Sequence, residues 1–269
     1  MGAQGRRSRS DESRPSGRHL LRSGSLAHEL VSQAAIAADD LVVEIGAGSG
    51  RITEPLAQSA GRVVAVELDP SFGEVLRRRF RDRSNVTVVE GDILQVPLPN
   101  APFRVFANVP FALTTAILHR LLDDPTSPLV CADLIVQYET ARKRVAVWPS
   151  NLVSLGWLPW WEFGLSRRLS ARAFEPVPAV DAGVLRITRR RPPLLSSDQR
   201  SQYLSLVQAG FGRAGLPLTR SLRHRIPERA WKRVARERGI GPQSKATDLD
   251  VFDWVALFGF MRGYRRPER

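Results

Sequence analysis

The chain of 269 residues is 43% hydrophobic and 25% charged, with a formal net charge of +13, which is typical of a globular protein with a full core. No apolar run approaches the ~20 residues that cross a bilayer, and the basic N-terminal segment lacks the apolar stretch of a secretory signal. The single cysteine, Cys131, excludes an internal disulfide, and the four histidines are scattered rather than grouped as metal ligands. We therefore expect a cytoplasmic protein without a membrane partner or a metal, in which Cys131 belongs to the core.

The positive charge is concentrated at the C-terminal end. Residues 182–269 hold 19 Lys and Arg against 7 Asp and Glu, whereas residues 1–181 hold 21 against 20. Almost all of the basic residues are arginines, whose planar guanidinium suits phosphates and base edges. This asymmetry favours a nucleic-acid partner held mainly by the C-terminal region. The alternative is a solvated helical surface in an arginine-rich protein.

Secondary-structure patterns alternate along most of the chain. Residues 1–18 have five arginines and almost no apolar residues, which predicts a disordered basic tail, and helical spacing follows from Leu20 to Ile36. Strand and helix patterns then alternate, which predicts an α/β fold with a mostly parallel seven-stranded sheet, an antiparallel edge and helices on both faces. The expected strands are Leu41–Ile45, Arg62–Val66, Val86–Val89, Phe103–Ala107, Leu129–Val136, Trp160–Leu165 and Gly183–Thr188. The expected helices between them are about Arg51–Ser59, Pro70–Arg81, Thr115–Leu122 and Glu139–Arg144.

The stretch Arg189–Ser197, with two prolines, marks a boundary between a domain of residues 19–191 and a basic helical domain of residues 192–269. Ser196 followed by Gln199 resembles a helix-capping box. Pro227 and Gly239 occupy positions preferred at a helix start and just beyond a helix end. The expected helices of this second domain are about Asp198–Phe211, Leu216–His224, Glu228–Arg238 and Leu249–Met261.

A glycine-rich turn follows the first of the seven strands, in the sequence LVVEIGAGSG of residues 41–50. Gly46, Gly48 and Gly50 alternate there and allow backbone N–H groups to approach a bound molecule closely. The spacing is G-x-G-x-G rather than the G-x-G-x-x-G of dinucleotide-binding folds. This favours a nucleoside-containing cofactor, with a plain strand-to-helix turn as the alternative.

Acidic residues accompany three successive strands: Glu44, Glu67 at the end of VVAVE, and Asp92 in VVEGDIL. In open α/β sheets the carboxyl ends of parallel strands form the usual binding crevice. There Glu67 can accept hydrogen bonds from both hydroxyls of a ribose, and Asp92 can bind an adenine amino group. Carboxylates around a nucleoside suit a cationic cofactor and leave no cradle for a pyrophosphate, and the sulfonium of S-adenosylmethionine fits this description.

The fourth strand leads into Asn108-Val109-Pro110-Phe111. Val109 precedes a proline and is therefore pushed to an extended conformation, so that its carbonyl can point outward. The Asn108 amide oxygen and such a carbonyl could accept both protons of an exocyclic amine and orient its nitrogen for methyl transfer. Phe111 could stack on the base, at ~1–3 kcal/mol. The alternative is a β-turn with a buried aromatic side chain.

These motifs, in this order and spacing, resemble the adenine-N6 methyltransferases of ribosomal RNA, with the erythromycin-resistance (Erm) group most similar. The resemblance rests on EIGAGSG, VELD, GDIL and NVPF, supported by Gln137-Tyr138-Glu139 and by Phe174–Asp181, and it covers residues 19–188. It implies a Rossmann-like methyltransferase domain that binds S-adenosylmethionine, and a helical domain that helps to hold rRNA. Members of the Erm group methylate an adenine of 23S rRNA and thereby block macrolide, lincosamide and streptogramin B antibiotics.

The N-terminal motif of the family differs in this chain. A Ser-Gln-Asn-Phe-Leu-like segment is usual, where polar residues touch the methionine end of the cofactor, and the sequence here reads Gly17-Arg18-His19-Leu20-Leu21. The resemblance implies that His19 and the backbone at Leu21 contact the cofactor. Phe111, where the family also uses tyrosine, keeps the stacking face and lacks the hydroxyl.

The sequence thus predicts a monomeric, Erm-like 23S rRNA adenine-N6 methyltransferase. The expected catalytic residues are Asn108, Pro110 and Phe111; the expected cofactor-binding residues are His19, Leu21, Glu44, Gly46, Gly48, Glu67, Asp92 and Asn108. One alternative is a dimethyladenosine transferase of small-subunit rRNA, with the same chemistry on other adenines. The other is a methyltransferase-derived RNA-binding protein without catalysis, against which the intact acidic residues and NVPF argue.

Overall fold

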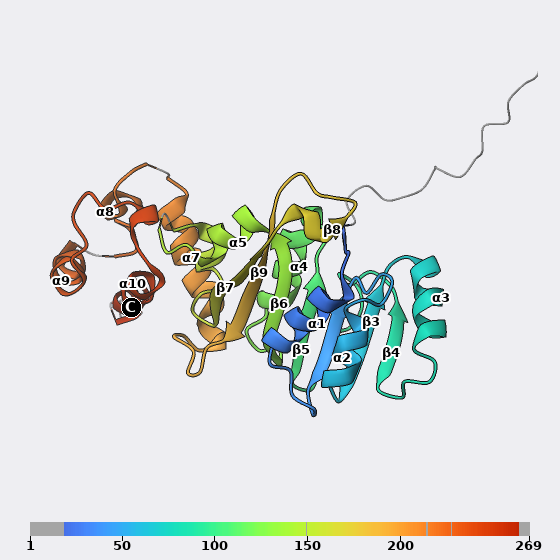
Figure 1. The fold of residues 1–269 in the computed structure, drawn as a ribbon. Coiled ribbons are helices and arrows are strands. Elements are labelled where there is room, and N and C mark those ends of the chain that lie inside the picture. The colour runs from blue at the N-terminus through green and yellow to red at the C-terminus, as the bar shows by residue number, and fades with distance from the viewer. Residues whose placement is uncertain (1–18, 149, 214, 227, 264–269) are drawn as a thin grey trace, which may run out of the picture.

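The computed structural model of the chain describes residues 19–148, 150–213, 215–226 and 228–263. A seven-stranded sheet runs through most of it, and a group of helices lies beyond one end of this sheet (Figure 1). The predicted disordered tail, residues 1–18, lies outside the described residues.

The sheet has the strand order β4-β3-β2-β5-β6-β9-β7. The pairings from β4 to β6 are parallel, whereas β9 pairs antiparallel with both β6 and β7. This confirms the predicted parallel sheet with an antiparallel edge. The strands are β2 (Leu41–Ile45), β3 (Arg62–Glu67), β4 (Val86–Glu90), β5 (Phe103–Asn108), β6 (Leu129–Gln137), β7 (Trp161–Leu169) and β9 (Ala182–Arg189).

Helices cover both faces of the sheet because the central strands are apolar on both sides. Val42 packs in a cluster with Leu30 and Leu56 from the first two helices, whereas its neighbour Val43 packs on the other face with Ile117. Cys131 is buried in β6, as predicted. The helices of this part are α1 (Gly24–Gln33), α2 (Thr53–Ser59), α3 (Pro70–Arg79), α4 (Thr114–Leu122), α5 (Tyr138–Val145) and α6 (Leu152–Leu155).

The first helix begins later than predicted. Leu20–Leu21 forms a short strand, β1, that pairs antiparallel with β8 (Phe174–Glu175). Helix α1 begins only at Gly24, after the N-cap Ser23, whose Oγ accepts from the backbone N–H of Leu26. The prediction of a helix from Leu20 was wrong because the apolar periodicity does not show that this hydroxyl caps the helix start.

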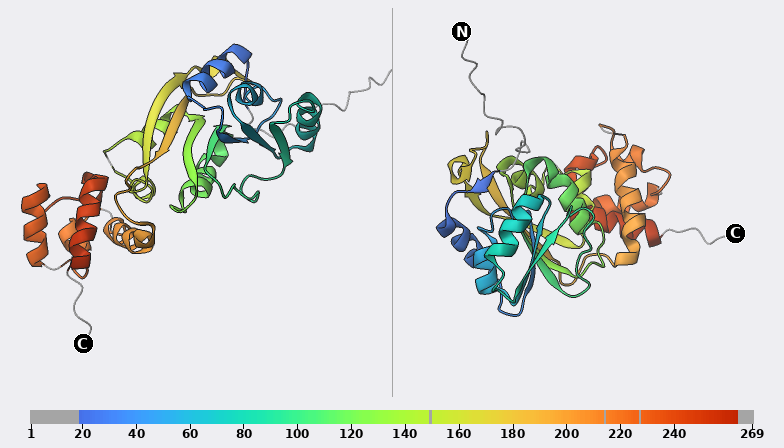
Figure 2. Two further views of the ribbon diagram at one scale, coloured as in Figure 1. Left: turned by 90° about the horizontal axis from the view of Figure 1, so that it is seen from below. Right: turned by 90° about the vertical axis from the view of Figure 1, so that its right-hand side faces the viewer.

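The C-terminal helices lie beyond β7, away from β4 (Figures 1 and 2). They are α7 (Arg200–Phe211), α8 (Leu218–Ser221), α9 (Glu228–Arg238) and α10 (Val251–Gly263). The predicted second helix is shorter than Leu216–His224, since it starts after Pro217. Gln199 accepts from the backbone N–H of Ser196 as expected of a capping box, and Gly239 follows α9 in the left-handed conformation, whereas Pro227 lies outside the described residues.

The two regions share one hydrophobic core. Tyr203 of α7 is fully buried and meets Trp160 edge-on, with ring centroids 6.2 Å apart. Leu206 and Val207 belong to the same continuous cluster as Trp157 and the sheet. The helical region is therefore packed against the sheet rather than joined to it by a free linker. Among the described residues, no helix has the length and apolar character needed to cross a membrane.

Candidate active site

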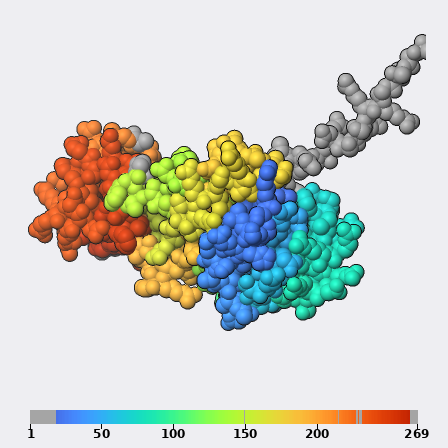
Figure 3. Space-filling model, in the orientation of Figure 1, coloured from blue at the N-terminus to red at the C-terminus, as the bar shows by residue number. Residues whose placement is uncertain are grey.

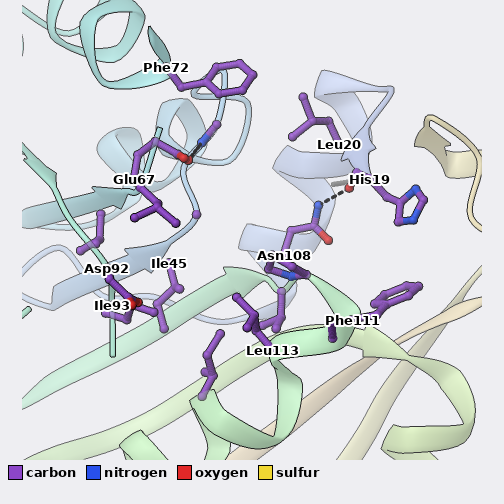
Figure 4. A pocket seen from close by; sticks show the side chains of 18 of the residues that line it. His19, Leu20, Ile45, Glu67, Phe72, Asp92, Ile93, Asn108, Phe111 and Leu113 are labelled. Carbon is purple, nitrogen blue, oxygen red and sulfur yellow. Dashed lines mark hydrogen bonds between the residues drawn. The ribbon is translucent and has the colours of Figure 1, made fainter. Parts of the chain in front are cut away.

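A cavity of about 510 Å³ opens at the carboxyl ends of the parallel strands (Figure 4). Its walls come from the turns that follow β2, β3, β4 and β5 and from the chain at β1. This is where open α/β sheets bind their ligands. The predicted site residues that line it are His19, Gly46, Gly48, Glu67, Asp92, Asn108, Pro110 and Phe111.

The glycine turn forms the floor of one end of the cavity. Gly46 and Gly48 have φ values of +71° and +54°, which a residue with a side chain adopts only with strain. A Cβ at Gly48 would lie 3.1 Å from Cδ2 of Leu20. The turn is tied to β3, because the N–H of Gly46 donates to the Val66 carbonyl at 2.9 Å. Backbone and ligand can therefore meet closely here.

Glu67 is held rigidly beside this turn. One carboxylate oxygen accepts from the N–H of Gly48 at 2.8 Å, and the other accepts from the N–H of Asp69 at 2.9 Å. The side chain is only 4% exposed, and Figure 4 shows it at the cavity wall. Each carboxylate oxygen can accept a second hydrogen bond, which is what two adjacent ribose hydroxyls require.

Asp92 lies on the same side of the cavity, after β4. Its Oδ1 accepts from the N–H of Leu94 at 2.9 Å, which fixes the turn that carries it. The apolar residues Leu68, Phe72 and Ile93 flank the two carboxylates. None of the three is among the predicted site residues; the available signal for Leu68 and Ile93 is that each directly follows a predicted site residue, Glu67 or Asp92. This part of the cavity wall therefore combines apolar side chains with two carboxylates, which suits a nucleoside.

Glu44 does not line the cavity, contrary to the expected grouping with Glu67 and Asp92. Its side chain is 1% exposed inside the sheet, where it is 2.6 Å from the hydroxyl of Thr53. Burial is the main reason that the pKa of this carboxyl is raised to about 8, and the charge of Glu67 raises it further. Glu44 is therefore mostly protonated at neutral pH and lies under the glycine turn as a neutral group.

Asn108 ends β5 at the other end of the cavity. Its Nδ2 donates to the main-chain oxygen of His19 at 2.6 Å, as drawn in Figure 4. The amide nitrogen is thus engaged, and the amide oxygen is the atom left to act as an acceptor. The N–H of the next residue, Val109, donates to the Ile135 carbonyl at 3.0 Å, so the turn stays attached to β6.

Phe111 lies in the same corner as His19. Their ring centroids are 5.7 Å apart with the planes tilted by 39°, and Nδ1 of His19 is 2.7 Å from the Pro176 carbonyl oxygen. The loop after β8 is thereby connected to the cavity. Leu20 lines the cavity, whereas Leu21 is 2% exposed and packs in the core. Leu20 and Leu21 are successive residues of the strand β1, so their side chains point to opposite sides, and that of Leu21 is turned away from the cavity.

The arrangement can hold a nucleoside at one end and a flat base with an exocyclic amine at the other. Among the described residues, no group of three or more His, Cys, Asp or Glu side chains is placed to hold a metal ion. The fold and the cavity define a Rossmann-like methyltransferase.

Comparison with known proteins identifies the family. The family described as "Ribosomal RNA adenine dimethylase" matches residues 11–262. The chain is 39% identical over 224 residues to the mycinamicin-resistance protein MyrB of Micromonospora griseorubida, covering 82% of this chain and 70% of that protein. It is 32% identical over 249 residues to an rRNA adenine N-6-methyltransferase of Bacillus licheniformis, covering 93% and 87% of the two chains.

Two solved structures of rRNA methyltransferases and related enzymes have the same fold as this chain. The 23S rRNA methyltransferase ErmE superposes with a TM-score of 0.81 at 28% identity, covering 90% of this chain and 99% of that one. A dimethyladenosine transferase from Plasmodium falciparum, at 19% identity and a TM-score of 0.76, has the same fold. The chain therefore belongs to the ribosomal RNA adenine dimethylase family, and the Erm-like resemblance drawn from its motifs is confirmed.

Proposed function

We propose that this protein transfers methyl groups from S-adenosylmethionine to N6 of a specific adenine in 23S rRNA, and that it thereby gives resistance to macrolide, lincosamide and streptogramin B antibiotics. The observation that carries the proposal is the fixed orientation of Asn108, whose amide nitrogen is engaged by the His19 carbonyl. Family membership and the names of the relatives, which include a mycinamicin-resistance protein, support it.

The residues present fit the cofactor. The left-handed turn at Gly46 and Gly48 excludes other side chains, since a Cβ at Gly48 would crowd Leu20 of the cavity wall, and Glu67 beside it is an acceptor for ribose hydroxyls. Asp92 would accept from the adenine amino group, with Leu68 and Ile93 against the ring. When bound, S-adenosylmethionine supplies a methyl group that its positively charged sulfur activates.

The acceptor adenine would occupy the end of the cavity at Asn108. To reach it, the base must leave its stack in the RNA and lie against Phe111. Asn108 Oδ1, with a main-chain carbonyl of the Asn108–Phe111 turn, accepts the two protons of the amine and favours an sp3 nitrogen with an exposed lone pair. Because an amide is not a strong base, the rate gain comes from positioning, and a proton leaves to solvent after the transfer.

The basic C-terminal region would hold the RNA backbone. Arg220, Arg223 and Arg236 are exposed, and none forms an ion pair with an acidic side chain of the described residues. In contrast, Arg238 is paired with Asp253 at 2.7 Å. Exposed arginines without acidic partners are available to phosphates.

The test is methyl transfer from labelled S-adenosylmethionine to a transcript that contains the peptidyl-transferase loop of 23S rRNA, with a small-subunit rRNA transcript in parallel. We expect N6-methylated adenine in the first, identified by mass spectrometry and located by primer extension. Methylation of the small-subunit transcript alone would support the dimethyladenosine transferase. Cofactor binding with no transfer to either would support a non-catalytic RNA-binding protein.

A further inference from the structure

One tryptophan differs from the rest in its environment. All six tryptophans lie in the described residues, and five of them are at most 7% exposed. Trp148, in the loop after α5, is 61% exposed, and its neighbour Val147 is 49% exposed. The two exposed side chains are adjacent in the chain, and contiguous exposed apolar surface, unlike a single exposed residue, is a mark of interaction sites.

The exposed indole is fixed rather than free. Its Nε1 donates to the main-chain oxygen of Asp248 at 3.2 Å. Two residues later, Ser150 donates from its N–H to the Thr247 carbonyl at 3.0 Å and from its Oγ to the Ala246 carbonyl at 3.1 Å. The loop is thus pinned to the segment before α10, with one edge of the indole ring tied down. Such a ring can receive a partner on its face at little cost in side-chain entropy.

Basic residues occur on both chain segments that are joined at Trp148. Arg142 and Lys143 of α5 are exposed, and Lys245 is exposed on the segment to which the loop is pinned. Two acidic residues lie there as well: Glu139 pairs with Arg142, and the Asp248 carboxylate accepts from the backbone N–H of Lys245 and keeps its charge. The three cations and two carboxylates leave a net charge of +1. A basic aromatic surface is complementary to single-stranded RNA, where phosphates meet cations and bases stack on rings.

The position of the loop relative to the cavity suits a long RNA substrate. Helix α5 begins directly after β6, whose residue Ile135 is in register with Asn108 of β5. In Figure 1, α5 lies between β8 and α8. Figure 3 shows the yellow-green surface of this part of the chain next to the orange and red helical region. RNA that reaches Asn108 and the basic helices would pass this surface.

We infer that Trp148 is a stacking platform for an unpaired base of the RNA substrate, outside the site of the methylated adenine. The inference rests on the proposed function only in taking RNA as the substrate. Base–aromatic stacking is worth about 1–3 kcal/mol, which corresponds to a change in affinity of roughly 5- to 150-fold.

Fluorescence tests this directly, because Trp148 is the tryptophan that acrylamide can reach. We expect strong quenching of the wild-type protein that falls when the 23S rRNA transcript is added. The Trp148→Phe variant should show weak quenching with or without the transcript. Unchanged quenching of the wild-type protein at saturating transcript would overturn the inference, even if the protein methylates the transcript.

Kinetics provide the second measurement. Trp148→Ala should raise the KM for the transcript by roughly 5-fold or more, with kcat and cofactor affinity unchanged, and Trp148→Phe should recover most of the loss. The control is Val75→Ala, since Val75 is a 39% exposed apolar residue of α3, which lies at the end of the sheet opposite β7. Thermal unfolding checks that the variants fold.

The outcomes separate the two proposals. A wild-type protein that methylates no rRNA contradicts the proposed function. Whether the transcript protects Trp148 from acrylamide quenching then still tests whether Trp148 stacks on an RNA base. An active wild-type protein with an unchanged KM in Trp148→Ala overturns the platform alone. If the substitution instead abolishes self-association in light scattering without changing the KM, the surface contacts a second copy of the chain and the platform is overturned.

Discussion

The side-chain amide of Asn108 donates to the main-chain oxygen of His19 at 2.6 Å, across 89 positions of the sequence. This bond decides which end of the amide faces the acceptor side of the cavity. It also makes the segment before α1 part of the active site, since β1 holds that segment in place by pairing with β8. The strand β5 supplies the catalytic side chain, and a distant backbone atom orients it.

Asn108→Ala should lower kcat for methyl transfer by at least about 100-fold, because the acceptor nitrogen loses its orientation. The affinity for S-adenosylmethionine should change little, since Glu67 and the glycine turn remain. Single-turnover methylation and isothermal titration calorimetry measure the two quantities. Full activity in this variant would remove Asn108 from the mechanism.

His19→Ala is the matched control for this prediction. The partner of Asn108 is the main-chain oxygen of His19, so removing the imidazole leaves that hydrogen bond in place. The variant loses the contacts with Phe111 and with the Pro176 carbonyl. We expect a decrease in kcat well below that of Asn108→Ala, and an equal loss in both variants would mean that the imidazole itself is required.

Glu67→Ala should weaken binding of S-adenosylmethionine by at least 10-fold. Two backbone N–H groups, of Gly48 and Asp69, lose a charged acceptor at about 1.5–3 kcal/mol each, and the ribose loses its partner. Calorimetric titration with the cofactor is the measurement. Glu90→Gln is the control, because Glu90 sits on the neighbouring strand, pairs with Arg77 and does not line the cavity. An affinity within 2-fold of wild type in Glu67→Ala would contradict the assignment.

The parts of the site that come from single sequence segments were predictable. The turn after each parallel strand must lie at one edge of the sheet, so Gly46, Glu67, Asp92 and Asn108 could be brought together from the alternating pattern alone. The prediction that Glu44 lines the cavity was wrong because Glu44 lies one residue before the end of β2 and its side chain is buried in the protein. Successive side chains of a strand point to opposite faces, so an error of one residue in placing the strand end reverses the predicted face.

Contacts between segments that are distant in the chain could not be predicted from the sequence. Nothing in the periodicity of residues 20–36 indicates that Leu20 pairs with Glu175, since a two-residue strand has no pattern of its own. The same holds for the shared core, where Tyr203 packs on Trp160 across the predicted boundary. The predicted boundary between residues 191 and 192 rests on prolines and on charge, and neither feature indicates which side chains pack together.

The buried carboxyl of Glu44 makes stability depend on pH. The unfolded chain ionises this group near its ordinary value of 4.5, whereas in the folded protein the pKa is about 8 because of burial. Between these values unfolding releases a proton, so the free energy of unfolding falls with rising pH by up to about 1.4 kcal/mol per pH unit from this group, and levels off above pH 8.

Glu44→Gln should remove that contribution. The amide keeps a hydrogen-bonding partner for the Thr53 hydroxyl and cannot ionise. We expect the variant to gain stability relative to wild type as the pH rises from 5 to 8, measured by urea unfolding at each pH. Glu74→Gln removes one negative charge from the exposed face of α3 and serves as the control. Parallel pH profiles for wild type and Glu44→Gln would contradict the buried neutral state.

The role of the basic helices is best tested by charge and not by deletion. Removing residues 192–269 would expose Trp160 and its neighbours, because Tyr203, Leu206 and Val207 belong to the same core. A triple substitution of Arg220, Arg223 and Arg236 to glutamine keeps the fold and removes three exposed charges. The slope of log K against log salt is negative, and each lost phosphate contact should make it less steep by about 0.7 to 0.9. Binding at low salt should also become weaker.

Arg78→Gln is the matched control, since Arg78 is an exposed arginine of α3, at the other end of the sheet. Filter binding of the 23S rRNA transcript across a range of salt concentrations gives the slopes. The triple variant should also keep its affinity for S-adenosylmethionine, because none of the three arginines lines the cavity. An equal slope in the triple variant and in Arg78→Gln would mean that phosphates are held elsewhere, and the basic α5 with Trp148 would then be the surface to examine by the same measurement.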